Sequence, residues 1–293
     1  MTSFLQNSNF FEGNNPENIA KDFGTPVYVY NEKILRDRMS KVAKVITKYP
    51  YTANYSVKAN TNIHILKLAL EEGLNCDAMS VGEITLLLKA GFPVERIFFV
   101  PNNVSSDELQ FALEKGVMTS LDSLSQLELF GKTCDSMNIQ PENRKCAVRI
   151  NPGVGAGHHE KVVTGGKKTK FGIAEYDIPQ IFLIATKYHI RIAGINQHIG
   201  SLFMDPQPYL DAVKNLLRIA HDFKDLDFID FGGGYGIPYH KLDDEKDFPM
   251  EDFKARLEPI LDEFVKSYGK APLFKSEPGR FCVAEASVIL GRV

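Results

Sequence analysis

The fold is decided by residues 51–79, which read YTANYSVKANTNIHILKLALEEGLNCDAM. Residues 51–57 form a short run typical of a buried strand, and residues 62–72 repeat apolar side chains at helical spacing. A second short run, typical of a strand, follows at 75–79. A strand, a helix and a second strand in this order predict a βα unit, which is the building block of a parallel sheet.

The same alternation continues along the rest of the chain. Eight strands are predicted, at Tyr51–Val57, Asn75–Met79, Arg96–Val100, Val117–Leu121, Cys146–Asn151, Arg191–His198, Phe228–Phe231 and Leu273–Ser276. Seven helices are predicted between them, at Asn62–Glu72, Val81–Lys89, Ser106–Glu114, Ser123–Met137, Asp177–Tyr188, Pro208–Phe223 and Pro249–Tyr268. This pattern predicts an α/β fold, a (β/α)8 TIM-like barrel.

Two segments do not fit this alternation. Thr25–Tyr30 is predicted to be a strand before the barrel, and Val283–Val293 a β-like run after it. We expect residues 1–30 to contribute a strand to a second β domain, residues 31–280 to form the barrel, and residues 281–293 to begin that second domain. A strand with so few partners is unstable, so the sequence predicts that most of the second domain is missing from this chain.

Composition excludes several classes of protein. The net charge of −3 comes from 34 basic and 37 acidic residues scattered over 293 positions, so there is no basic stripe for nucleic acid. The apolar stretches are far shorter than the roughly 20 residues that span a membrane. The N-terminus lacks the basic start and apolar run of a signal peptide, which predicts a cytoplasmic protein. The four cysteines include no C-x-x-C pair, so no zinc site or redox dithiol is expected.

Reactive groups are expected at the C-terminal ends of the strands, where barrel enzymes carry their active sites. Lys58 follows the first strand, and an ammonium in an apolar setting needs a partner or a chemical use. Gly232, Gly233 and Gly234 follow the seventh strand, where successive backbone N–H groups can hold a phosphate. A tight turn that needs positive φ is the structural alternative for these glycines. Ile237 stands where a dinucleotide fingerprint needs its last glycine, and no P-loop pattern is present.

The eighth predicted strand leads into a polar turn formed by Glu277, Pro278, Gly279 and Arg280, and His198 ends the sixth predicted strand. Taken alone, His198 is more often a packed or surface histidine, and a Glu–Arg pair in a turn is commonly structural. Beside a reactive lysine and a phosphate cradle, however, a carboxylate suits the protonated ring nitrogen of pyridoxal 5'-phosphate. The histidine ring can then lie on that cofactor, and Ser201 can add a hydroxyl to the phosphate site.

The chain resembles the barrel domain of the fold-type III pyridoxal-phosphate decarboxylases. The resemblance rests on seven motifs in family order, namely YSVKAN (55–60), DAMSVGE (77–83), RINPG (149–153), KFG (170–172), HIGS (198–201), FGGGYG (231–236) and EPGR (277–280). The long loop 153–169 favours the diaminopimelate branch over the ornithine and arginine branches. Its paired His158 and His159 are expected to be solvated, with no metal bound.

The resemblance implies a role for each site residue. Lys58 forms the Schiff base with the cofactor and His198 stacks on its ring. Glu277 meets the ring nitrogen, and Arg280 binds near the phosphate and the substrate carboxylate. The phosphate is held by Ser201, Gly232, Gly233 and Gly234, the cofactor turn also includes Pro278 and Gly279, and Asp77 and Ser80 give support.

The resemblance further implies an activity, decarboxylation of meso-2,6-diaminopimelate to L-lysine and CO₂ by a homodimer. In the family the proton-donating cysteine, an acidic neighbour and a tyrosine come from the second β domain, so this chain is expected to bind the cofactor without a complete active site. The alternatives are an ornithine- or arginine-type decarboxylase, a racemase of the same barrel class, and a non-catalytic barrel that pairs with a related subunit. Retention of Lys58, His198, Glu277 and Arg280 argues against the last of these.

Overall fold

Eight parallel strands close into a barrel in the computed structural model, which describes residues 9–151, 153, 170–239 and 245–293. Each strand pairs with the next in the ring, and β10 pairs with β2 to close it. All eight predicted strands are confirmed, with ends shifted by at most two residues. They are β2 (Tyr51–Ser56), β3 (Asn75–Ala78), β4 (Ile97–Phe99), β5 (Met118–Leu121), β6 (Lys145–Asn151), β8 (Arg191–Asn196), β9 (Phe228–Asp230) and β10 (Leu273–Ser276).

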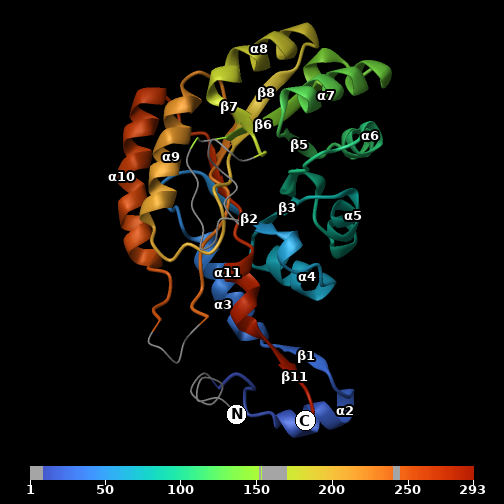
Figure 1. Cartoon of the computed structure of the whole chain (residues 1–293), viewed down its shortest axis with the longest axis vertical. Coiled ribbons are helices and arrows are strands. Elements are labelled where there is room, and N and C mark those ends of the chain that lie inside the picture. Colours follow the sequence, from blue (N-terminus) through green and yellow to red (C-terminus); the bar gives the residue numbers. More distant parts are fainter. Residues whose placement is uncertain (1–8, 152, 154–169, 240–244) are drawn as a thin grey trace.

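Helices surround the barrel (Figure 1). The seven predicted helices are confirmed, and α3 (Glu32–Ala43) was not predicted, although Leu35, Met39 and Val42 are buried on one of its faces at helical spacing. The two-residue strand β7 (Ile173–Ala174), which pairs with β6, was also missed because it is too short to show a pattern. The confirmed helices are α4 (Ile63–Glu71), α5 (Val81–Ala90), α6 (Ser106–Lys115), α7 (Leu124–Ser136), α8 (Ile178–Lys187), α9 (Gln207–Ala220) and α10 (Met250–Tyr268).

Local sequence explains where these helices begin and end. The side chain of Ser105 accepts a hydrogen bond from the backbone N–H of Glu108, and the Glu108 carboxylate accepts one from the Ser105 N–H, forming a capping box at the start of α6. The helix ends at Gly116, which is in the left-handed conformation that glycine adopts without steric cost. Such defined ends fix where each following strand enters the barrel.

A two-stranded ribbon lies outside the barrel. In it β1 (Val27–Tyr30) pairs antiparallel with β11 (Ser287–Leu290), and Figure 1 shows the ribbon extending from the barrel near both chain ends, beside α2 (Pro16–Phe23). The predicted β-like run is confirmed at Ser287–Leu290, but its start at Val283 was placed four residues too early. The chain first forms the short helix α11 (Arg280–Val283) and a 3₁₀ turn, because Phe281 and Cys282 are buried as the helix packs against α3. The domain boundaries at residues 30 and 280 stay a prediction.

The inside of the barrel has an apolar lower part and a polar upper part. Phe98 and Phe228 meet edge to face with ring centroids 5.3 Å apart, in a small cluster separate from the main core between sheet and helices. Nearer the C-terminal ends of the strands, Asp77, Asp230 and Glu277 are buried. The polar layer therefore lies directly below the face on which the site was predicted.

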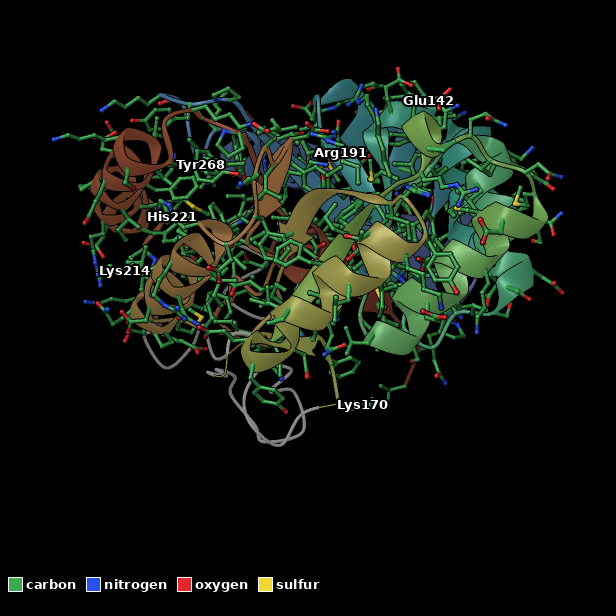
Figure 2. All side chains as sticks on the ribbon, turned by 90° about the horizontal axis from the view of Figure 1, so that it is seen from above. Glu142, Lys170, Arg191, Lys214, His221 and Tyr268 are labelled. Carbon is green, nitrogen blue, oxygen red and sulfur yellow. The ribbon has the colours of Figure 1, made fainter. Side chains whose placement is uncertain are left out.

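The outer helices pack through aromatic side chains. His221, at the end of α9, lies edge-on to Tyr268 of α10 with ring centroids 5.7 Å apart, and Figure 2 shows both on the outside of the barrel. A groove of about 350 Å³ runs between these helices and includes Lys214. The groove belongs to the helical layer, away from the strand ends. None of the helices in the described part of the chain combines the length and the apolar character of a membrane span.

Candidate functional site

Two adjoining cavities of about 480 and 270 Å³ lie at the C-terminal ends of the barrel strands. The larger one extends toward the ribbon and is lined by Tyr28 and Tyr30, while the smaller one reaches down to Asp77 and Arg149. Both are lined by the same four predicted site residues, Lys58, His198, Ser201 and Glu277. The larger cavity adds three more of them, Gly234, Gly279 and Arg280.

Lys58 is presented by a turn rather than by a strand. It lies in the 3₁₀ turn Val57–Ala59 that follows β2, and its side chain is exposed. The expectation that Lys58 lies in an apolar setting was therefore wrong, because the turn places its side chain outside the sheet. Its Nζ lies 3.6 Å from the sulfur of Met79. An accessible amine that borders both cavities is well placed to react with an aldehyde.

His198 forms part of the wall shared by the two cavities. Its Nδ1 accepts a long hydrogen bond of 3.4 Å from the backbone N–H of Gly233, so the ring proton is assigned to Nε2. Burial, helped by the positive charges of Lys58 and Arg149, holds the pKa of His198 well below its usual range. The imidazole is therefore neutral near pH 7 and offers a flat, uncharged face.

The three glycines that follow β9 make different contacts. Gly232 donates its N–H to the Asp230 carboxylate at 2.9 Å, and Gly233 donates to His198. A Cβ on Gly232 would lie 2.2 Å from the Gln197 carbonyl oxygen, and one on Gly233 would lie 1.8 Å from that of Glu277. Only Gly234 of the three lines the described cavities. Positive φ at Gly232 and Gly234 agrees with the tight-turn alternative, and neither Gly232 nor Gly233 has room for a side chain. The phosphate cradle at Gly232, Gly233, Gly234 and Ser201 stays a prediction.

Glu277 is buried at the floor of both cavities. Burial, together with the negative charges of Asp230 and Asp77, raises the pKa of Glu277 well above its usual range. Its Oε1 has no hydrogen-bond partner among the described residues. A buried carboxyl oxygen without a donor is costly, and a ring N–H of a bound molecule would remove that cost. The residues present therefore fit a pyridine ring at this position.

The remaining predicted residues lie around this centre. The Arg280 Nη1 donates a hydrogen bond to the hydroxyl of Tyr239, with the guanidinium carbon 5.8 Å from the Tyr239 ring centroid. Pro278 does not line the described cavities, and its carbonyl accepts a hydrogen bond from the Ser56 N–H at 3.1 Å. Ser80 caps α5 by accepting from the Glu83 N–H. Asp77 lines the smaller cavity with Lys58.

Three buried charged residues were not predicted to belong to the site. Arg149 was quoted within a motif without a role, and Asp230 and Lys275 were not assigned a role at all, yet all three are buried inside the barrel. A signal was present, because each charge lies in or at the end of a short strand whose other residues are mostly apolar or small. Strand periodicity would have placed them on the inner face.

Comparison with known proteins identifies the family of the chain. Residues 32–284 match the family model described as pyridoxal-dependent decarboxylase, pyridoxal binding domain. The diaminopimelate decarboxylase of Methanothermobacter thermautotrophicus is 39% identical over 283 residues, covering 94% of this chain and 64% of that protein. That of Staphylococcus aureus is 32% identical over 290 residues, covering 96% of this chain and 67% of that protein. The chain thus spans about two thirds of the length of these relatives.

A solved structure shows the same architecture. The crystal structure of diaminopimelate decarboxylase from Helicobacter pylori complexed with L-lysine superposes with a TM-score of 0.85 at 28% sequence identity. The match covers 94% of this chain and 68% of that one. The barrel and the segments that flank it are therefore shared with a protein that binds L-lysine.

Proposed function

The chain belongs to the pyridoxal-dependent decarboxylases, and on that premise we propose that it supplies the cofactor-binding barrel of an enzyme that converts meso-2,6-diaminopimelate into L-lysine and CO₂. One observation carries the proposal: an accessible lysine and a buried carboxyl oxygen without a donor border the same cavities. These are the two groups that a pyridoxal ring needs at its opposite ends. The diaminopimelate relatives support the choice of substrate.

Each residue has a separate task in this proposal. Lys58 would provide the amine that holds the cofactor covalently. Glu277 accepts the hydrogen bond of the ring N–H and stabilises its positive charge. His198, neutral, packs its face on the ring, while Ser201 and the N–H of Gly234 bind the phosphate. The bound cofactor supplies an electron sink for the electron pair left by the departing carboxylate.

Arg280 is proposed to bind the anionic end of the substrate. Its guanidinium lies at the larger cavity and is buttressed by the Tyr239 hydroxyl and ring. A planar guanidinium pairs with a carboxylate through two parallel hydrogen bonds. The second carboxylate of diaminopimelate, which ornithine lacks, suits such a partner. A homodimer, a cytoplasmic location and a proton donor from a second β domain stay predictions.

The substrate choice is tested by CO₂ release. We expect the protein that carries this chain to decarboxylate meso-diaminopimelate at least about ten-fold faster, as kcat/KM, than ornithine, arginine or lysine, because a site that pairs a carboxylate rejects analogues lacking it. The measurement is release of labelled CO₂ from each amino acid with pyridoxal phosphate present. A preference for ornithine would replace our choice with the ornithine-type alternative. Cofactor binding without release from any of the four would favour the non-catalytic barrel.

The role of Glu277 is tested by Glu277→Gln. The amide keeps the shape but cannot stabilise a positive ring nitrogen, so we expect kcat to fall on the order of 10²-fold while the absorbance of lysine-bound cofactor persists. Stopped assays and the absorbance spectrum measure the two effects separately. Glu263→Gln, an exposed change on α10, is the matched control and should alter neither. Full activity in Glu277→Gln would remove this carboxylate from the mechanism.

A further inference from the structure

An arginine lies among the apolar residues of α3. Leu35, Met39 and Val42 form the buried face of this helix, and Arg38 falls on the same face, one turn after Leu35 and one turn before Val42. The Arg38 side chain is only 14% exposed. A guanidinium on an apolar face is costly unless it is paired, so the position of Arg38 requires a reason.

Arg38 forms a buried ion pair with Glu285, which lies in the 3₁₀ turn Ala284–Ala286 before β11. The guanidinium nitrogen Nη2 lies 2.6 Å from the Glu285 carboxylate oxygen Oε2, and the Glu285 side chain is 4% exposed. Such a pair is weak evidence for stability, because the cost of removing both charges from water offsets much of their attraction. Its more specific effect is to fix α3 and the turn relative to each other.

The same guanidinium packs on α11, the one-turn helix that begins with Arg280. Its carbon Cζ lies 5.1 Å from the ring centroid of Phe281, which directly follows Arg280 and is buried. A helix of four residues is not stable by itself, and no side chain caps the start of α11. Contacts with α3 therefore help to fix its position, and Arg38 makes two of them, to Phe281 and to Glu285.

A longer contact connects Arg38 with a second segment of the site. Its Nη2 lies 3.9 Å from the carboxylate of Asp247, in the connection between β9 and α10 that also carries Tyr239. The Tyr239 hydroxyl accepts a hydrogen bond from Arg280. Arg38 is therefore in contact both with the helix that carries Arg280 and with the connection that carries the hydrogen-bond partner of Arg280.

Arg280 has one part of its guanidinium group held and another part available. Tyr239 accepts from Nη1, whereas the buried Nε has no hydrogen-bond partner among the described residues. Arg280 also lines the larger cavity, so an anion there can accept from this Nε. Two parallel hydrogen bonds to a carboxylate require a well-placed guanidinium, and that placement depends on where α11 lies.

We propose that Arg38 is a positioning residue for substrate binding, which holds α11 so that Arg280 faces a carboxylate of the substrate. It does so through the ion pair with Glu285 and the contact with Phe281. The inference deepens the proposed function and rests on it for the role of Arg280. Arg38 lines neither of the two described site cavities, so it acts on the substrate only through α11.

The experiment compares Arg38→Met, Glu285→Met and the double variant with the unchanged protein that carries this chain, at saturating pyridoxal phosphate. Each single change leaves a buried charge without this partner, so we expect the equilibrium constant for unfolding to rise on the order of 10²-fold. The double variant replaces both charges by apolar side chains and should return to within about ten-fold of the unchanged protein.

The KM for meso-diaminopimelate should behave differently from stability. We expect KM to rise about ten-fold in both single variants and to stay raised in the double variant, because the link to α11 is broken in all three. The kcat should stay within about two-fold, since the change affects binding of a part of the substrate that does not react. Release of labelled CO₂ over a range of substrate concentrations separates the two constants.

Arg36→Met is the matched control, because it removes another arginine of α3. Arg36 pairs with Glu32 on its own helix and with Glu71 and Glu72 at the end of α4, and none of these belongs to α11 or to the turn that follows it. Whatever it does to stability, this change should leave KM within about two-fold.

A double variant that recovers both stability and KM would mean that the pair only stabilises the fold, and would overturn the proposal. An unchanged KM in the single variants, or a fall in kcat at unchanged KM, would overturn it as well. Failure of the proposed function would appear differently, as no CO₂ released by the unchanged protein. Hydrogen exchange of the backbone amides of residues 280–286 would then decide, because it needs no turnover. Faster exchange in the double variant would support the role of Arg38 in holding α11, and equal exchange would overturn it.

Discussion

We expect Lys58→Ala to abolish covalent attachment of pyridoxal phosphate and to lower decarboxylation by roughly 10³-fold or more. Lys58 is the lysine that borders both described cavities, with its side chain exposed in the turn after β2. Without its amine, the cofactor aldehyde has no covalent partner at this place. The absorbance of lysine-bound pyridoxal, recorded after removal of free cofactor, measures the loss directly.

The control for this variant is Lys67→Ala, which removes an exposed lysine from the neighbouring helix α4. It should leave both absorbance and activity unchanged. Unfolding measurements should show Lys58→Ala as stable as the unchanged protein within about 0.5 kcal/mol, because an exposed side chain contributes little to folding. Retained absorbance in Lys58→Ala would show that another lysine carries the cofactor.

We expect Gly233→Ala to destabilise the protein by about 3 kcal/mol and to prevent cofactor binding. The added methyl would lie 1.8 Å from the carbonyl oxygen of Glu277, and no flexible side-chain end is available to move aside, because the obstacle is backbone. The Glu277 N–H donates to the Gly232 carbonyl at 3.0 Å, so a shift of either segment moves the carboxyl that faces the ring nitrogen. Denaturant unfolding and cofactor absorbance measure the two losses.

Gly82→Ala is the matched control, because Gly82 lies in α5 and the nearest atom to an added Cβ is the Ser80 hydroxyl at 3.7 Å. That change should stabilise the protein by about 0.5–1 kcal/mol, as alanine favours a helix over glycine. An equally mild effect of Gly233→Ala would mean that the strand ends of β9 and β10 are not tightly packed. The site would then have to tolerate movement of Glu277.

Elements with a repeated pattern could be predicted from the sequence. Alternating strands and helices from Tyr51 to Ser276 predicted the barrel, and the order of the strands placed Lys58, His198 and Glu277 at one face. The start of the run after the eighth strand could not be assigned in this way. Short apolar runs suit helix and strand equally, and residues 280–283 form α11, which packs on α3, before β11 begins at Ser287.

Contacts between residues of different strands could not be predicted from the sequence. Successive glycines predict a cradle or a turn alike, and only the closeness of the Gln197 and Glu277 carbonyls shows that positions 232 and 233 have no room for a side chain. The exposure of Lys58 depends on one 3₁₀ turn, and the burial of Lys275 depends on neighbours from other strands, such as Phe228. Such effects are set by tertiary packing, which local pattern does not encode.

The ribbon outside the barrel has a consequence for the order of folding. Val27 pairs with Leu290, so its two strands are separated by almost the entire chain. Bringing such distant segments together costs conformational entropy, unless the intervening chain is already compact. The intervening chain is compact once β10 pairs with β2 and closes the barrel. This pairing also brings β1 near β11, because β1 precedes β2 and β11 follows β10. We therefore expect the ribbon to form late, after the ring of strands has closed.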